Sequence, residues 1–275
     1  MSGTLQNGNF YGGVRSERGV SGLTLAETGY DAGFVVPPHE HTHPFFCLAL
    51  QGSFAERFER RRWTATPATV FYHPAGAEHA EEFGADGGRL FNIQLGGDWL
   101  ARLETFDMRP PDRQLHSRGG RATRIAVSML EEYRMGDTAS ELALDGLALA
   151  LLAQVVRRGR TAEPKGRGVR PGWLADVESL LHEAVADPVD IATIASAVDV
   201  HPVHLARVFR RHHGCSPGEY LRRLRVRTAC DLLAGTDRSL AGIALATGYA
   251  DQSHFTRQFK RAMGTTPGAY RRLIG

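Results

Sequence analysis

The segment His204-Leu-Ala-Arg-Val-Phe-Arg-Arg211 recurs fifty residues later as His254-Phe-Thr-Arg-Gln-Phe-Lys-Arg261. The residues after each copy match as well: Gly214, Pro217, Gly218 and Tyr220 are repeated as Gly264, Pro267, Gly268 and Tyr270. Upstream, Ile194-Ala195 corresponds to Ile243-Ala244, with one extra residue in the second copy. A duplication at a fixed offset indicates two equivalent structural units.

Each copy carries the start and stop residues of two short helices joined by a tight turn. Asp190 and Ser239 stand where the first helix of each copy begins, and Pro202 and Asp251 stand where the second begins. A glycine follows each second helix, as a helix C-terminus favours. The sequence therefore predicts an all-α C-terminal domain, residues 173–275, with two helix-turn-helix units.

The second helix of each copy has an apolar face and an outward polar face. Arginine, glutamine, serine and threonine on an exposed helix suit base edges in the major groove. The candidate DNA-binding residues are Val203, Ala206, Arg207, Arg210, Gln252, Ser253, Thr256, Arg257 and Lys260. Arginines that flank them are candidates for phosphate contacts, namely Arg211, Arg222, Arg223, Arg225 and Arg261. The alternative is a helical protein–protein module with a solvated basic face.

The charge of the chain is unevenly distributed. Residues 1–164 carry 17 basic and 20 acidic side chains, whereas residues 165–275 carry 16 and 10, so a net −3 precedes a net +6. This asymmetry favours contact between the C-terminal part and a polyanion. No apolar run is long enough to span a bilayer, and from the polar, Gly-rich first residues we expect no secretory signal. With three dispersed cysteines, we expect reduced thiols in the cytoplasm.

Residues 173–272 resemble the DNA-binding domain of the AraC/XylS family. The resemblance rests on Leu205-x-Arg207-x-Phe209, Gly214-x-x-Pro217-x-x-Tyr220 and their second copies, together with Gly248-Tyr249. It implies a sequence-specific transcription regulator, and not an enzyme, that places its two recognition helices in successive major grooves of double-stranded promoter DNA. A homodimer and contact with RNA polymerase are further expectations. From the side chains, we expect Arg207 and Arg257 to read guanine and Gln252 to read adenine.

The N-terminal part has a different pattern. Short alternating segments such as 45–50 and 69–72, punctuated by Gly and Pro, predict an all-β sandwich or barrel over residues 1–97. Helical patterns follow at 121–134 and 137–158, within a segment 98–160 that we assign to dimerisation; packing onto the β-domain is the alternative. Residues 161–172, rich in Gly, Pro, Lys and Arg, are the expected linker.

A group of histidines marks a candidate binding site in this β-domain. In the segment Gly33-Phe-Val-Val-Pro-Pro-His-Glu-His-Thr-His43, His39, His41 and His43 share one face if the segment is a strand. His79 follows in Pro74-Ala-Gly-Ala-Glu-His79. Converging imidazoles can bind a divalent metal, hydrogen-bond an organic effector in a metal-free pocket, or serve structure alone.

The spacing of these residues resembles the two cupin motifs and implies an N-terminal cupin-like β-barrel. The metal set implied by the resemblance is His39, His41 and His79, with His43 as a fourth ligand or just outside the set, and with Zn, Fe or Ni as the metal. It contains no carboxylate, because the cupin glutamate falls at Phe45 or Phe46. We expect His73 on the opposite face. A metal or small-molecule effector controlling the regulator is the favoured function; the alternative is a metal-dependent cupin oxygenase or isomerase fused to a DNA-binding domain.

Overall fold

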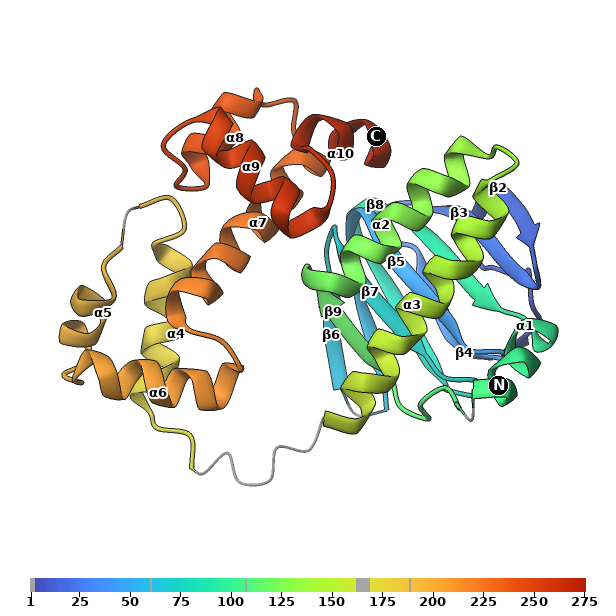
Figure 1. The fold of residues 1–275 in the computed structure, drawn as a ribbon, viewed down its shortest axis with the longest axis horizontal. Helices are drawn as coiled ribbons and strands as arrows, with labels where there is room; N and C mark the ends of the chain where they lie inside the picture. Colours follow the sequence, from blue (N-terminus) through green and yellow to red (C-terminus); the bar gives the residue numbers. More distant parts are fainter. Residues whose placement is uncertain (1–2, 60, 107, 162–168, 188) are drawn as a thin grey trace. The chain divides into compact units, whose positions relative to one another are not determined.

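A computed structural model describes the chain except for residues 1–2, 60, 107, 162–168 and 188 (Figure 1). The chain divides into two compact units, residues 1–162 with 269–275 and residues 163–268. The first is built on a β-sheet and the second is helical, which agrees with the mixed fold class predicted from the sequence. Each unit is described by itself.

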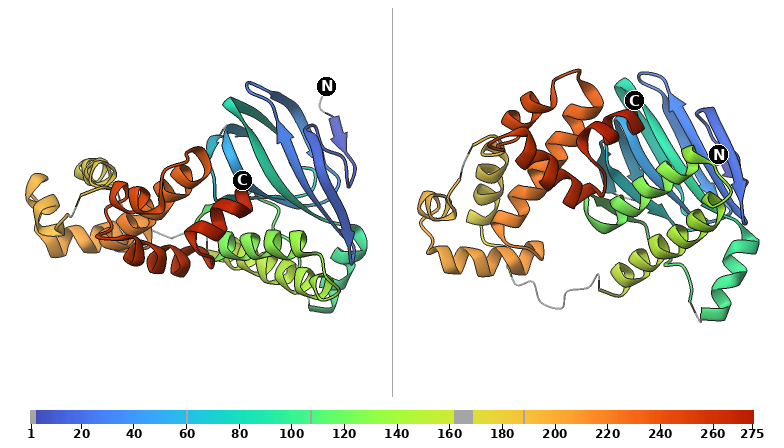
Figure 2. Two further views of the ribbon diagram at one scale, coloured as in Figure 1. Left: turned by 90° about the horizontal axis from the view of Figure 1, so that it is seen from above. Right: turned by 45° about the horizontal axis from the view of Figure 1, so that its top comes forward.

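One nine-stranded sheet forms the first unit. Its strands are β1 (Gly3–Leu5), β2 (Gly13–Val20), β3 (Leu23–Tyr30), β4 (Val35–His41), β5 (Phe45–Phe58), β6 (Arg61–Ala65), β7 (Thr69–His73), β8 (His79–Leu95) and β9 (Leu115–Arg118). The order is β1-β4-β8-β5-β7-β9, with β3 also paired to β8, β2 to β3, and β6 to β5. All described pairings are antiparallel except β1 with β4. The sheet curves strongly, as Figure 2 shows.

The two longest strands, β5 and β8, bend together. Their register shifts twice, between Ala49 and Gln51 and again between Gly52 and Phe54. At this bend the backbones approach closely: Gly52 has φ +71°, and a Cβ there would lie 1.9 Å from the carbonyl oxygen of Gly87. Only glycine fits such a position. The bend lets side chains from β4, β5, β7 and β8 face one interior.

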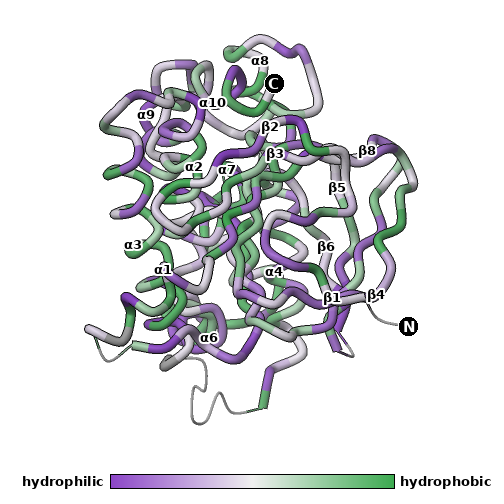
Figure 3. Tube along the Cα trace, turned by 90° about the vertical axis from the view of Figure 1, so that its right-hand side faces the viewer, coloured by the Kyte–Doolittle hydropathy of each residue, from purple (hydrophilic) through white to green (hydrophobic). Residues whose placement is uncertain are grey.

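Two helices, α2 (Gly120–Met135) and α3 (Ser140–Thr161), follow the sheet, after the short α1 (Gly97–Ala101) and η1 (Arg102–Phe106). They confirm the helices predicted at 121–134 and 137–158. Asp137 Oδ1 accepts the backbone N–H groups of Ala139 and Ser140, which starts α3. Figure 3 shows hydrophobic residues along both helices. The face of α3 with Leu144, Ala148 and Leu151 is buried, and α3 packs along α2.

The second unit contains the predicted repeat. Its helices are α4 (Trp173–Glu183), α5 (Ile191–Ala197), α6 (Pro202–His213), α7 (Pro217–Gly235), α8 (Leu240–Ala246) and α9 (Gln252–Met263); α10 (Pro267–Ile274) ends the chain. The pairs α5–α6 and α8–α9 are the two helix-turn-helix units, and α7 connects them. Asp190 and Ser239 cap α5 and α8, and Gly214 and Gly264 end α6 and α9 in the left-handed conformation, as predicted.

Most of the expected linker, namely residues 162–168, lies outside the described residues. None of the helices that the structure describes is both long and apolar enough to cross a membrane.

Candidate metal-binding pocket and nucleic-acid interface

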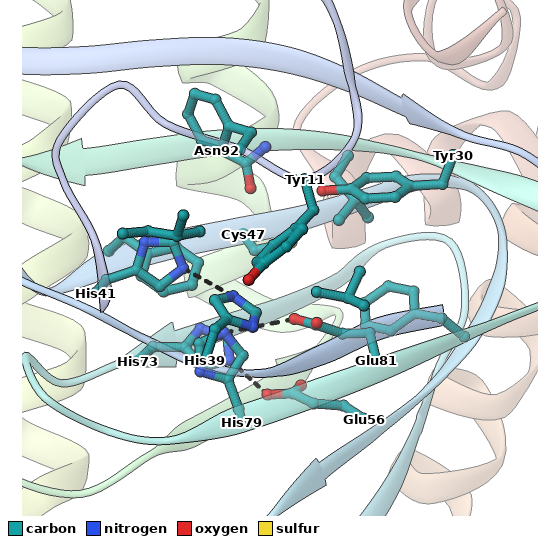
Figure 4. A pocket seen from close by; sticks show the side chains of 16 residues that line it. Tyr11, Tyr30, His39, His41, Cys47, Glu56, His73, His79, Glu81 and Asn92 are labelled. Atoms are coloured by element: carbon teal, nitrogen blue, oxygen red, sulfur yellow. Dashed lines mark hydrogen bonds and ion pairs between the residues drawn. The ribbon is translucent and has the colours of Figure 1, made fainter. Parts of the chain in front are cut away.

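A small cavity in the first unit is lined by ionisable side chains from four strands together with aromatic and aliphatic ones. His39 and His41 come from β4, Glu56 from β5, His73 from β7, and His79 with Glu81 from β8 (Figure 4). Strand pairing brings the segments together, because His39 and His79 are direct partners in the β4–β8 register. The cavity measures about 30 Å³, and all four histidines are buried.

Backbone carbonyls orient two of these imidazoles. His39 Nδ1 lies 3.0 Å from the carbonyl oxygen of Pro37, and His79 Nδ1 lies 2.9 Å from that of Ala77. A carbonyl can only accept a hydrogen bond, so both Nδ1 atoms carry the proton. The neutral rings therefore present the lone pair of Nε2 to the cavity, an arrangement that histidine ligands of metals usually have.

The ring nitrogens lie close to one another. His39 Nε2 accepts a hydrogen bond from His41 Nε2 at 3.2 Å, and one ring nitrogen from each of His39, His41 and His79 falls within 4.8 Å of the others. Ligand atoms bonded to one tetrahedral ion at 2.0–2.1 Å are about 3.3 Å apart. Among the described residues, the buried Nε2 of His79 has no hydrogen-bond partner. These residues therefore fit a divalent transition metal.

Burial keeps the histidines neutral. It lowers the pKa of His41 to about 2 and that of His73 to about 3, and it lowers the pKa values of His39 and His79 as well. Neighbouring imidazoles lower the pKa of His41, His73 and His79 further, because like charges would repel. A metal binds the neutral form, so the four rings are ready as ligands near pH 7 without losing a proton.

One prediction about this pocket is wrong. His73 faces the cavity and not the opposite side: its ring stacks on His79 with centroids 4.4 Å apart, and its Nε2 lies 2.5 Å from Glu56 Oε1. The carboxyl groups of Glu56 and Glu81 also line the cavity, although the mutually close set consists of the three histidines alone. Burial raises the pKa of Glu56 to about 8. Glu81, two residues after His79 on one strand, could have been found from strand alternation alone.

His43 is not brought into the histidine group. It lies beyond the end of β4, its Nδ1 is 3.1 Å from the hydroxyl of Thr42, and the mutually close set consists of His39, His41 and His79. Phe45, at a position of the missing cupin glutamate, is buried and stacks on His73 with centroids 4.3 Å apart.

The second unit presents the predicted DNA-binding residues on its surface. On α6, Val203, Arg207 and Arg210 are exposed and Ala206 is half-buried, while Leu205, Val208 and Phe209 are buried behind them. On α9, Phe255, Phe259 and Met263 are buried, and the exposed or half-buried outward residues are Gln252, Ser253, Thr256, Arg257 and Lys260. The His201 ring and the Asp251 carboxylate accept backbone N–H groups at the starts of these helices.

Arg225, which was predicted to contact phosphate, makes hydrogen bonds inside the second unit. Arg225 donates to the carbonyl oxygens of Val185, at 3.0 Å, and Asp187, at 2.8 Å. Its guanidinium also lies over the ring of Tyr249. Because these groups occupy its donors, Arg225 holds helices together inside the second unit. Arg211, Arg222 and Arg261 remain exposed.

The repeat, its caps and its exposed polar faces define a protein that binds DNA through two helix-turn-helix units. A family model described as a helix-turn-helix domain matches residues 194–273. The probable transcription factor PqrA of Proteus vulgaris is 40% identical over 83 residues, which are 30% of this chain and 68% of that protein. The chain belongs to the AraC family of transcription regulators.

Other relatives match different shares of the chain. The regulator GlxA of Rhizobium meliloti (strain 1021) is 38% identical over 119 residues, 43% of this chain, so the chain spans 36% of GlxA. The transcriptional activator RhaR of Klebsiella pneumoniae is 28% identical over 244 residues, 84% of this chain and 86% of that protein. The DNA-binding domain of AdpA, solved with a target DNA, is 29% identical over 36% of this chain and 89% of that chain, with a TM-score of 0.35. These relatives are transcription regulators and not enzymes.

Proposed function

We propose that this AraC-type regulator is controlled by a divalent transition metal bound by His39, His41 and His79. The observation that carries the proposal is the convergence of three buried imidazole nitrogens within 4.8 Å of one another. Of these, His39 and His79 are held by backbone carbonyls at Nδ1, so that Nε2 of each ring is the atom that would bind the ion. In this proposal residues 1–97 form the effector-binding domain, and the protein acts in the cytoplasm, where promoter DNA lies.

The size of the cavity favours a metal over an organic effector. Sites for drug-sized molecules measure about 300–1,000 Å³, whereas this cavity measures about 30 Å³. Such a volume suits one small occupant such as an ion, since one water molecule takes about 30 Å³ of liquid.

The test begins with elemental analysis of the full-length protein purified without chelator and without a metal-affinity tag. We expect one equivalent of a single transition metal, lost in His39→Ala and His79→Ala but retained in the matched control His43→Ala. Binding to promoter DNA should then change when metal is removed from the wild type and should stay unchanged in His39→Ala. A protein that binds its promoter and responds to an organic molecule, yet takes up no metal, would contradict the proposal.

We further infer that α3 pairs with α3 of a second copy, with 98–160 as the dimerisation segment. Opposite its buried face, α3 carries a second apolar stripe at heptad spacing: Leu142, Gly146, Leu149, Ala153 and Val156. Leu142 is 80% exposed. A helix that is apolar on both faces is normally covered on both. Leu149→Glu should shift the sedimentation coefficient to that of a monomer, whereas Arg121→Glu, on the exposed side of α2, should not.

DNA recognition is assigned to α6 and α9. Arg207 and Arg257 are proposed to read guanine and Gln252 adenine, with RNA polymerase as a further partner on the promoter. Selection of bound sequences from random DNA tests the readout. Half-sites without a guanine that either arginine can reach would contradict it.

A further inference from the structure

Two carboxyl groups face the histidines from neighbouring strands. Glu56 on β5 and Glu81 on β8 are direct cross-strand partners. The side chain of Glu56 is 1% exposed and that of Glu81 is 13% exposed. Two acidic side chains placed opposite each other in a sheet interior are unfavourable as anions, and burial raises the pKa of both. A cation bound beside them would stabilise the charged form.

The two carboxyl groups differ in their partners. Glu56 Oε1 contacts His73 Nε2 and accepts a hydrogen bond from the side-chain amide of Gln114. Glu81 Oε1 lies 3.4 Å from His79 Nε2. Over the part of the chain that the structure describes, the buried Oε2 of Glu81 has no hydrogen-bond partner. The buried Oε2 of Glu56 has no hydrogen-bond partner among the described residues either. Glu56 is held through Oε1 by two residues outside the three-histidine set, whereas Glu81 contacts His79, a member of that set.

We propose that Glu81 is the anionic fourth ligand of the metal bound by His39, His41 and His79. The inference rests on the proposed function. Its Oε1 lies 3.4 Å from His79 Nε2, close to the separation of about 3.3 Å between two ligand atoms on one tetrahedral ion. Glu81 follows His79 by two residues on β8, so both side chains leave the same face of the strand. The mutually close set contains the three histidines alone; Glu81 joins the ion by rotation about its side-chain bonds.

The double charge of the metal ion is the reason to expect a carboxylate among its ligands. Three neutral imidazoles leave the full double charge of the ion inside a buried cavity, which is costly. One carboxylate halves that charge. Phe45, which packs against the rings of His41 and His73, offers no ligand atom. The mixed nitrogen and oxygen set suits Zn²⁺ or Fe²⁺ and disfavours a soft ion such as Cu⁺.

The test compares Glu81→Gln with Glu82→Gln in the full-length protein. Gln keeps the shape of the side chain and removes the charge. Glu82 is the next residue, exposed and directed to the other face, where it pairs with Arg62. Affinity for Co²⁺ is measured by competition with a chelator, and the visible absorption of bound Co²⁺ reports its ligands. We expect Glu81→Gln to weaken binding at least tenfold and to change the Co²⁺ spectrum, with Glu82→Gln within twofold of the wild type.

The outcomes separate the two proposals. If the wild type binds no Co²⁺, the proposed function itself fails. If Co²⁺ binding depends on His39 but Glu81→Gln matches the wild type in affinity and spectrum, only the role of Glu81 is overturned. Loss of affinity in Glu56→Gln without loss in Glu81→Gln overturns it too. Should Glu81→Gln not fold, Glu81→Asp keeps a shorter carboxylate: a shifted Co²⁺ spectrum supports ligation, and an unchanged spectrum contradicts it.

Discussion

The helical unit and the sheet unit bury different kinds of side chain. In the helical unit, the buried polar residues among those described are two threonines, Thr247 and Thr265, and Thr247 donates to the carbonyl of Ile243. The sheet unit buries four histidines and two glutamates. Glu27 is paired with Arg89 and Arg134, whereas the pocket around His79 retains polar atoms without hydrogen-bond partners.

From this difference we expect the two units to bind different partners. The helical unit has single buried polar atoms, such as the Tyr249 hydroxyl, but its candidate DNA-binding side chains lie on its surface, on α6 and α9. The sheet unit instead gathers imidazole and carboxyl groups in one pocket, and buried polar atoms there are stabilised when a ligand supplies their partners. We therefore expect a ligand to change the stability of the sheet unit and DNA to contact the helical unit.

The largest expected effect is on the stability of the sheet unit. At free metal of a thousand times its Kd, binding should stabilise this unit by about 4 kcal/mol. Calorimetry of the full-length protein should show the sheet-unit transition moving up in temperature, with the helical transition unchanged. His39→Ala should abolish the shift. A shift of both transitions by the same amount would mean that the two units unfold together.

The next effect concerns DNA. Arg257→Ala and Arg207→Ala should each weaken specific DNA binding by about 1–3 kcal/mol, because each removes a side chain proposed to contact guanine. Fluorescence anisotropy with specific and scrambled duplexes measures the loss. Metal stoichiometry should not change in either variant. Equal loss on both duplexes would assign the arginine to phosphate and not to base reading.

A smaller effect depends on pH in the metal-free protein. The folded pKa of His41, about 2, lies below its unfolded value, so only the unfolded chain gains a proton as the pH falls below about 6.5. Stability is therefore lost on acidification, by about 1–2 kcal/mol for this residue between pH 6.5 and 5. Urea unfolding with chelator, compared between wild type and His41→Gln, should show the variant losing less by that amount. Parallel losses would contradict neutral burial of His41.

The smallest effect tests the equivalence of the two repeats. Ser239→Ala and Asp190→Ala each remove an N-cap and should each destabilise the helical unit by about 1 kcal/mol. Chemical denaturation measures both. A much larger loss at one cap would show that one repeat carries more of the stability.

The sequence predicted the helical unit well because its signals are local. Caps at Asp190 and Ser239 and the left-handed glycines act within a few residues of themselves. The role of Arg225 was missed because its partner, the carbonyl of Val185, lies forty residues upstream. No local pattern reveals such a contact.

The pocket was predicted in part for a related reason. Strand alternation placed His39 and His41 on one face, and motif spacing added His79. Alternation fails across β5, since the register shifts at the bend near Gly52 change which residues face inward. His73 on β7 and Glu56 on β5 are seventeen residues apart in the sequence, and their contact depends on how the folded strands are placed, which no local pattern gives.

The clamp made by Arg225 has a consequence for the operators this regulator can use. The residue lies in α7, between the two reading helices, and ties it to the segment before α5 and to Tyr249 before α9. The distance and the angle between α6 and α9 are then fixed by the protein. One base pair inserted between the two half-sites turns the second by about 35° around the duplex. In the proposed readout by α6 and α9, we therefore expect the spacing between the half-sites of the operator to matter for binding as well as the bases themselves.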